Sequence, residues 1–113
     1  MDNLVQEVFN LCEKLTASIN RLKENGVKLA QAESNYKITL RTEALKLRQE
    51  KGMPVTLISQ IIYGVPEVAK LRLERDIAET VYETNKEYIN VTKLQLKVLE
   101  NQIQREWGAK SET

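Results

Sequence analysis

The sequence predicts an all-α fold: a long antiparallel helical hairpin, resembling a coiled coil, with a short helix in its connector. The chain of 113 residues has only four glycines and two prolines, a composition that favours long helices over strands and turns. Apolar residues recur at helical spacing in two long segments, and these flank a central stretch that holds both prolines. Because the two segments match in length, we expect them to pack against each other in one domain, residues 1–113.

The first helix is predicted over residues 3–51. Its apolar positions begin with Leu4, Val8, Leu11, Leu15, Ile19 and Leu22, and a heptad row continues in phase through Leu29 to Tyr36. The row passes Gly26 without losing phase, so one helix is preferred, with Gly26 costing about 1 kcal/mol relative to alanine. A break at Gly26 into two helices is the alternative. The single cysteine, Cys12, cannot form an intrachain disulfide and is interpreted as a small buried hydrophobe.

The connector is predicted over residues 52–65. Gly52 followed by Pro54 should end the first helix, because glycine adopts the left-handed conformation readily and proline cannot continue the hydrogen-bond ladder. Thr56 is expected to cap a short helix that Gly64 closes, and Pro66 suits the first turn of the next helix. One apolar face should cover the open end of the hairpin, formed by Val55, Ile58, Ile61, Ile62 and Val65. The residues proposed to bind a partner at this tip are Leu57, Ile58, Ile61, Ile62 and Tyr63.

The second long helix is predicted over residues 66–107, with Gly108 as its stop and residues 108–113 as a frayed tail. Its inner stripe consists of Ala78, Tyr82, Asn85, Ile89, Thr92, Leu96, Leu99 and Ile103. Asn85 and Thr92 either fix the register of the packing or lie at its solvated margin.

A second apolar stripe lies beside the inner one on this helix, and it begins at Ile77. One partner helix cannot cover both stripes, so we expect a homo-oligomer, with a dimeric bundle as the simplest form. The residues assigned to its interface are Val81, Tyr88, Val91 and Val98.

The net charge is only +1, so no global field indicates a nucleic-acid or membrane partner. The middle of the chain is more basic than the rest, and its candidate phosphate contacts are Lys37, Arg41, Arg48, Lys51, Arg72 and Arg75. In the alternative interpretation these bases pair with neighbouring acids, namely Glu43, Glu50, Glu67 and Glu74. The stretch "LISQIIYGVPEVAKLRLER" has an incomplete helix-turn-helix pattern and is better explained as a capped helical turn.

The sequence contains no catalytic signature. Histidine is absent, and with it the commonest general base and zinc-nitrogen ligand. There is no glycine-rich phosphate loop, and the row Glu79, Glu83 and Glu87 is interpreted as a solvated face rather than a metal site. We therefore expect no enzyme activity, no cofactor and no metal. The sequence also lacks an apolar run of membrane-spanning length and a signal-peptide core, so we expect no membrane partner and a cytoplasmic location.

Two stretches carry a resemblance to a known group of proteins: "KGMPVTLISQIIYGVPEVAKLRLERDIAETVY" and "EYINVTKLQLKVLENQIQREWG". The central Gly-Met-Pro-Val-Thr and the closing Arg-Glu-Trp-Gly are their most recognisable elements. The chain resembles small uncharacterised proteins of temperate phages and prophages of Firmicutes. This resemblance implies a viral gene expressed inside a bacterium, and it supplies no activity for any residue.

The favoured function is a non-enzymatic protein–protein interaction module that acts on an unidentified host or phage protein, because the strong signals in the sequence are all packing signals. A nucleic-acid-binding accessory protein that uses the basic central segment is the second hypothesis.

Overall fold

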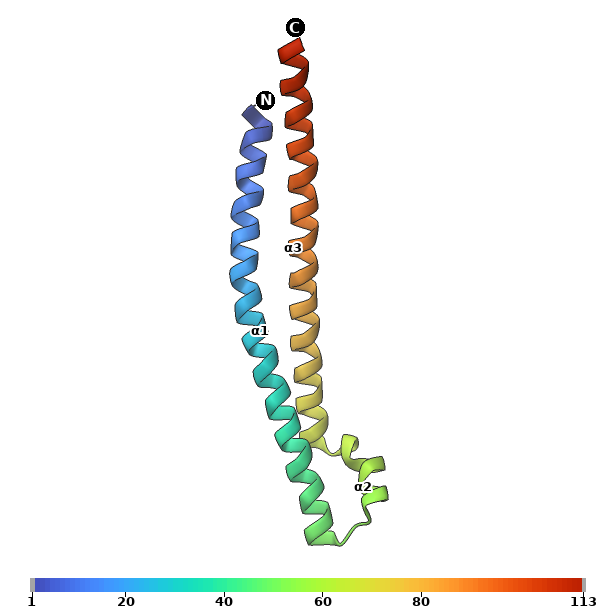
Figure 1. Cartoon of the computed structure of the whole chain (residues 1–113). Helices are drawn as coiled ribbons and strands as arrows, with labels where there is room; N and C mark the ends of the chain where they lie inside the picture. Colours follow the sequence, from blue (N-terminus) through green and yellow to red (C-terminus); the bar gives the residue numbers. More distant parts are fainter. Residues whose placement is uncertain (1, 113) are drawn as a thin grey trace. The chain divides into compact units, whose positions relative to one another are not determined.

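The computed structural model describes residues 2–112, and side chains over residues 3–108. Helix α1 spans Asp2–Lys51, helix α2 spans Val55–Ile61, the 3-10 turn η1 spans Ile62–Gly64, and helix α3 spans Pro66–Glu112 (Figure 1). The described residues contain no strand, so the predicted all-α helical hairpin is confirmed. Helix α1 runs through Gly26, and the alternative of a break there is wrong. Helix α3 also runs through Gly108 to Glu112, because one glycine costs a helix only about 1 kcal/mol, so the predicted stop at Gly108 is wrong. The last residue of the predicted tail, Thr113, lies outside the described residues.

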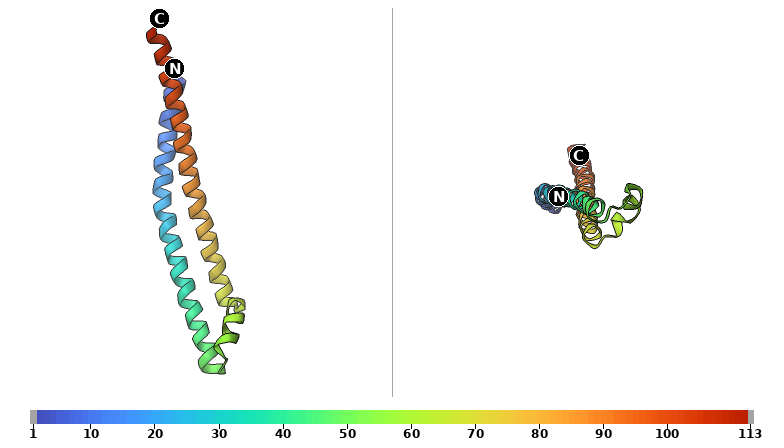
Figure 2. Two further views of the ribbon diagram at one scale, coloured as in Figure 1. Left: turned by 45° about the vertical axis from the view of Figure 1, so that its right-hand side comes forward. Right: turned by 90° about the horizontal axis from the view of Figure 1, so that it is seen from below.

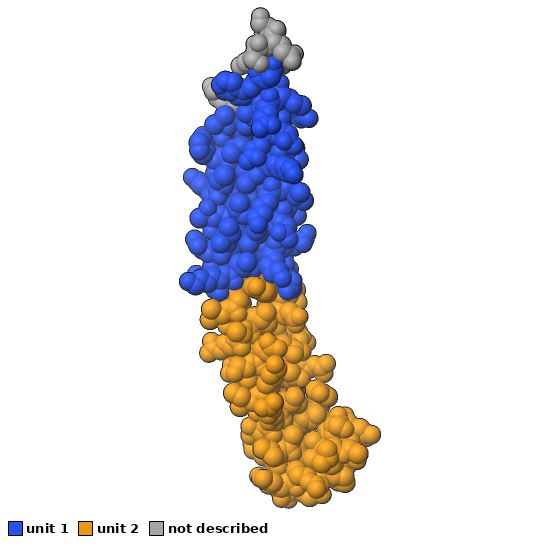
Figure 3. Space-filling view, viewed as in Figure 1, with its two compact units in different colours: residues 1–24, 83–113 blue, residues 25–82 orange. Residues whose placement is uncertain are grey.

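The chain comprises two compact units (Figure 3). The division of the sequence into domains stays a prediction. Unit 1 combines the residues up to Glu24 with those from Glu83 onward, and unit 2 is the continuous stretch from Asn25 to Tyr82. In each unit a stretch of α1 lies beside a stretch of α3, as two further views also show (Figure 2). Unit 2 additionally contains α2 and η1.

Helix α1 ends in the left-handed turn that the sequence predicts. Gly52 has a φ of 60°, and the backbone N–H of Met53 donates to the carbonyl of Leu47 at 3.2 Å. Leu47 and Met53 both pack against the core of unit 2, and they occupy the two positions at which this type of helix end commonly has apolar residues. The Nη1 of Arg48 also donates to the carbonyl of Met53 at 3.0 Å, an exposed hydrogen bond that links the last turn of α1 to the residue after Gly52.

Helix α2 begins differently from the prediction. Pro54, not Thr56, is the N-cap, and its extended backbone directs its carbonyl to accept the N–H groups of Leu57 and Ile58, each at 3.0 Å. No side chain caps this helix. Thr56 lies inside the first turn, where its carbonyl accepts a hydrogen bond from Ser59. The prediction of Pro66 as the first residue of the following helix is confirmed.

The core of unit 2 brings α1, α2, η1 and α3 together. Its buried side chains are Tyr36 from α1, Ile58 from α2, Ile62 from η1 and Val68 from α3. Partly buried apolar residues surround them, namely Leu40, Ala44, Leu47, Met53, Val65 and Leu71. The connector is therefore apolar in part because Met53, Ile58, Ile62 and Val65 complete the core between the two long helices.

The core of unit 1 contains a polar layer. Ser18 and Thr92 are 0% and 1% exposed, and Ile89 is buried with them. The Nδ2 of Asn85 donates to the backbone carbonyl of Ser18 at 3.1 Å, and the Oγ1 of Thr92 donates to the carbonyl of Tyr88 at 2.8 Å. Asn85 and Thr92 therefore lie between the helices, and the alternative that placed them at a solvated margin is wrong.

The inner stripe predicted for α3 is confirmed, since none of its eight side chains is exposed. On α1 the heptad row from Val8 to Tyr36 also faces inward. Two assignments on α1 are wrong: Ile19 is 49% exposed, and Cys12 is exposed rather than buried. The alternating steps of four and three residues through Leu11 and Leu15 lead to Ser18, so Cys12 and Ile19 each lie one position past the inward-facing row.

Candidate interaction surfaces

The two faces of α2 differ sharply in burial. Leu57 and Ile61 are one helical turn apart and are 42% and 39% exposed, and Tyr63 in η1 is 47% exposed. Ile58 and Ile62 are 7% and 4% exposed, because they face the core of unit 2. Of the five residues proposed for a partner-binding tip, these two isoleucines are core residues and cannot contact a partner.

Val55 and Ile61 also depart from the prediction, which placed both on the face that covers the hairpin. Val55 is 66% exposed and lies at the first position of α2, before the helix reaches the core. We define the connector surface as the four exposed apolar side chains of α2 and η1: Val55, Leu57, Ile61 and Tyr63.

Tyr63 in the connector surface is held by a cation. The guanidinium carbon of Arg72, two turns into α3, lies 4.9 Å from the centre of the Tyr63 ring. Such a contact stabilises an exposed ring by about 0.5 to 1 kcal/mol. The connector surface therefore contains an aromatic ring, Tyr63, over which the guanidinium of Arg72 lies.

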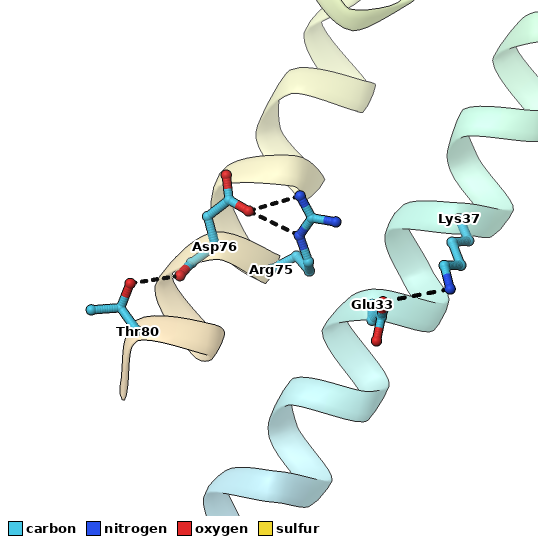
Figure 4. A network of polar contacts seen from close by, with 5 residues as sticks. All are labelled: Glu33, Lys37, Arg75, Asp76 and Thr80. Carbon is cyan, nitrogen blue, oxygen red and sulfur yellow. Dashed lines mark hydrogen bonds and ion pairs between the residues drawn. The ribbon is translucent and has the colours of Figure 1, made fainter. Parts of the chain in front are cut away.

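Most of the predicted phosphate contacts already have partners within unit 2. Lys37 forms an ion pair with Glu33 at 3.5 Å, and Arg75 forms one with Asp76 at 2.8 Å, as Figure 4 shows. These acids differ from the predicted partners; of those, Glu43 pairs with Lys46. Arg48 donates to a backbone carbonyl and Arg72 covers Tyr63, whereas Arg41 and Lys51 are exposed at the surface of α1.

The hydrogen bond between Arg75 and Asp76 raises the pKa of the Arg75 guanidinium above its ordinary value. No group of three or more acidic or cysteine side chains gathers around a metal-sized space in the described part of the chain.

The second apolar stripe of α3 is exposed along its length. Tyr88, Val91 and Val98 are 44%, 43% and 61% exposed in unit 1, and Val81 is 46% exposed in unit 2. Sequence reasoning missed Leu94, which is 64% exposed beside them. Its signal was the spacing of three and four residues that separates it from its apolar neighbours.

An open groove of about 620 Å³ runs between the two helices of unit 1 on this side. Val91, Leu94 and Val98 of α3 form its apolar wall. The α1 side of the groove is mainly polar. Its residues are Glu7, Asn10 and Lys14, together with Leu11.

Comparison of the chain with models of known protein families, with curated proteins and with solved structures finds no match. The resemblance to phage and prophage proteins thus stays an expectation. Among the described residues, no helix combines the length and the apolar character needed to cross a bilayer.

Proposed function

We propose that the chain is a non-enzymatic protein–protein interaction module whose connector surface binds a protein of a bacterial host or of a phage in the bacterial cytoplasm. The observation that carries this proposal is the exposure of Leu57, Ile61 and Tyr63 together on a short, anchored element. Leu57 and Ile61 are one turn apart on α2 and Tyr63 follows in η1, and exposed apolar side chains that gather in this way on a packed scaffold are characteristic of a binding site.

The anchoring supports a binding role because it fixes the shape of the surface in advance. Ile58 and Ile62 bury their side chains on one face of the connector, and this leaves Leu57 and Ile61 on the other. A partner therefore does not have to order the connector, which lowers the entropic cost of association. Tyrosine and arginine are also enriched among the residues that dominate binding energy, and Tyr63 and Arg72 lie together here.

The test is photo-crosslinking in bacterial cells with a photoreactive amino acid placed at Leu57 or at Tyr63. We expect a crosslink to a protein other than a second copy of the chain. Lys23, exposed on α1 in unit 1, is the matched control position and should give no such product. The proposal is wrong if both connector positions crosslink only to the chain itself or to nothing.

Two variants separate binding from folding. The double variant Leu57→Ser, Tyr63→Ser should lose the crosslinked partner, with the photoreactive residue at Ile61, and keep its stability within about 1 kcal/mol, since both side chains are exposed. Ile58→Ala should cost about 2 to 4 kcal/mol, because its side chain is 7% exposed and packs in the core. A double variant as unstable as Ile58→Ala would place Leu57 and Tyr63 in the core and contradict the proposal.

One observation favours nucleic-acid binding as the second candidate. Tyr63 and Arg72 could together stack on an unpaired base and contact its phosphate, with Arg41 and Lys51 exposed on the same unit. Fluorescence anisotropy with single-stranded and duplex DNA and RNA at several salt concentrations tests this. Salt-sensitive binding that is lost in the charge reversal Arg41→Glu, Lys51→Glu would favour this function over protein binding.

A further inference from the structure

The two flanks of α3 in unit 1 differ in charge although both are largely exposed. One position before each inner residue the chain has Thr84, Tyr88, Val91, Gln95, Val98 and Gln102. One position after each inner residue it has Glu83, Lys86, Asn90, Lys93, Lys97, Glu100 and Gln104. The first flank contains no charged side chain and the second contains five, so only the second has the composition of a face that stays in water.

The uncharged flank borders the groove of unit 1. Leu94 and Val98, more than 60% exposed, form its wall with Val91. The opposite rim, on α1, has one acid and one base seven residues apart, Glu7 and Lys14, with Asn10 between them. The spacing is two helical turns, so the two charges lie on one face of α1 but too far apart to pair with each other.

We propose that a second copy of this chain occupies the groove, docked antiparallel about a two-fold axis that passes near Asn10 and between Leu94 and Gln95. This axis reverses the helix direction of the second copy and keeps α1 opposite α1 and α3 opposite α3. It places Val91 of one copy against Val98 of the other. It also places Glu7 of each copy against Lys14 of the other, which makes two ion pairs related by the axis.

Charge complementarity selects this arrangement over a parallel one. A two-fold axis parallel to the helices would set α3 of one copy against α1 of the other. The apolar wall with Val91 and Val98 would then bury Glu7 and Lys14 without an opposite charge, which is costly. In the antiparallel arrangement apolar residues meet apolar residues, and each acid meets a base at the rim.

The closed two-fold pairing also differs from a head-to-tail contact. Unit 1 has apolar side chains on the other flank of α1, namely Val5, Phe9 and Ile19. Contact between that flank and the groove of the next copy would leave one groove and one flank open, so the assembly would grow without closing. The two proposals for this chain use different units, and the dimer does not depend on the connector surface.

The first experiment measures the association of the whole chain by sedimentation equilibrium in reducing buffer, up to several hundred micromolar. We expect a monomer–dimer equilibrium in the wild type. Val91→Lys should weaken the dimer at least tenfold, whereas the control Asn90→Lys, exposed on the charged flank, should leave the dissociation constant unchanged. A monomer at all concentrations, continued growth beyond the dimer, or equal effects of the two variants would overturn the proposal.

The second experiment tests the axis by charge exchange. Glu7→Lys and Lys14→Glu should each weaken the dimer, by roughly three- to tenfold, because each sets like charges against each other twice. The double variant should associate as the wild type does. An equimolar mixture of the two single variants should also dimerise, since one supplies only bases and the other only acids at these positions. Failure of both the double variant and the mixture to restore association would overturn the antiparallel arrangement, even if Val91→Lys dissociates the dimer.

Discussion

The guanidinium carbon of Arg75 in α3 lies 4.7 Å from the centre of the Tyr36 ring in α1. This contact joins the two helices within unit 2. The same side chain forms an ion pair with Asp76 at 2.8 Å. Tyr36 is 6% exposed and belongs to the core, so the arginine covers an aromatic ring that is otherwise surrounded by apolar side chains. A basic residue that the sequence suggested for phosphate contact thus has a structural role.

We expect Arg75→Met to destabilise the protein by about 1 kcal/mol, because it removes the cation over a largely desolvated ring while keeping the length of the side chain. Urea unfolding followed by circular dichroism at fixed protein concentration measures the loss. Arg72→Met is the comparison, since Tyr63 is exposed, and its effect should be about half as large. Asp76→Asn measures separately what the ion pair of Arg75 contributes. Equal losses in the two variants would contradict the burial argument.

Alanine at Gly26 and at Gly52 should change stability in opposite directions. At Gly26 a Cβ would meet only the Tyr82 ring, at 3.4 Å, so Gly26→Ala should stabilise α1 by up to about 1 kcal/mol. At Gly52, with φ +60°, the same change should cost about 1 to 2 kcal/mol because a Cβ disfavours the left-handed conformation. Thermal unfolding of the two variants measures both. Destabilisation by Gly26→Ala would show that the Tyr82 ring cannot adjust to the added methyl group.

Ser18 should tolerate a small apolar residue but not a large one. The side chain is 0% exposed in the core of unit 1, so Ser18→Leu should cost about 1 to 3 kcal/mol through overpacking. Ser18→Ala should lie within about 0.5 kcal/mol of the wild type, because it loses only the hydrogen bond from Arg21 and gains helix propensity. Urea unfolding gives both values. A neutral Ser18→Leu would mean that the helices of unit 1 are less closely packed than the burial of Ser18 indicates.

The long helices could be predicted from the sequence because heptad phase is a repeated signal. The heptad row from Val8 to Tyr36 predicts one continuous helix in spite of Gly26. The inner stripe of α3 can be recognised because its spacing repeats over eight positions. The assignment of inward-facing residues failed where an apolar residue lies beside the position that the heptad spacing places inside. Ile19 is apolar but follows Ser18, and the small serine is the residue that the alternation of four and three places inside.

The candidate sites could be predicted only in part. The exposure of Leu57 and Tyr63 follows from their positions on the turn, but whether Ile58 and Ile62 meet a partner or the core depends on where α2 packs. The cap at Pro54 depends on the extended backbone of that residue. The sequence does not show this backbone conformation, and it offered Thr56 as the more usual capping residue. The groove of unit 1 depends on which α1 side chains lie opposite Val91 and Val98, and only the pairing of the helices supplies that.

The two units also differ in when their residues are all synthesised during translation. Unit 2 is one continuous stretch of the chain, whereas unit 1 combines two separate stretches. Ser18 in the first stretch of unit 1 can form its hydrogen bond only after Asn85, 67 residues later, has been synthesised. Helices form in microseconds, and ribosomes add about 5 to 20 residues per second. Unit 2 is therefore fully synthesised before the stretch of α3 from Glu83 onward, which covers the N-terminal apolar row from Leu4 to Leu22. For those seconds the nascent chain exposes an apolar row that the finished protein covers.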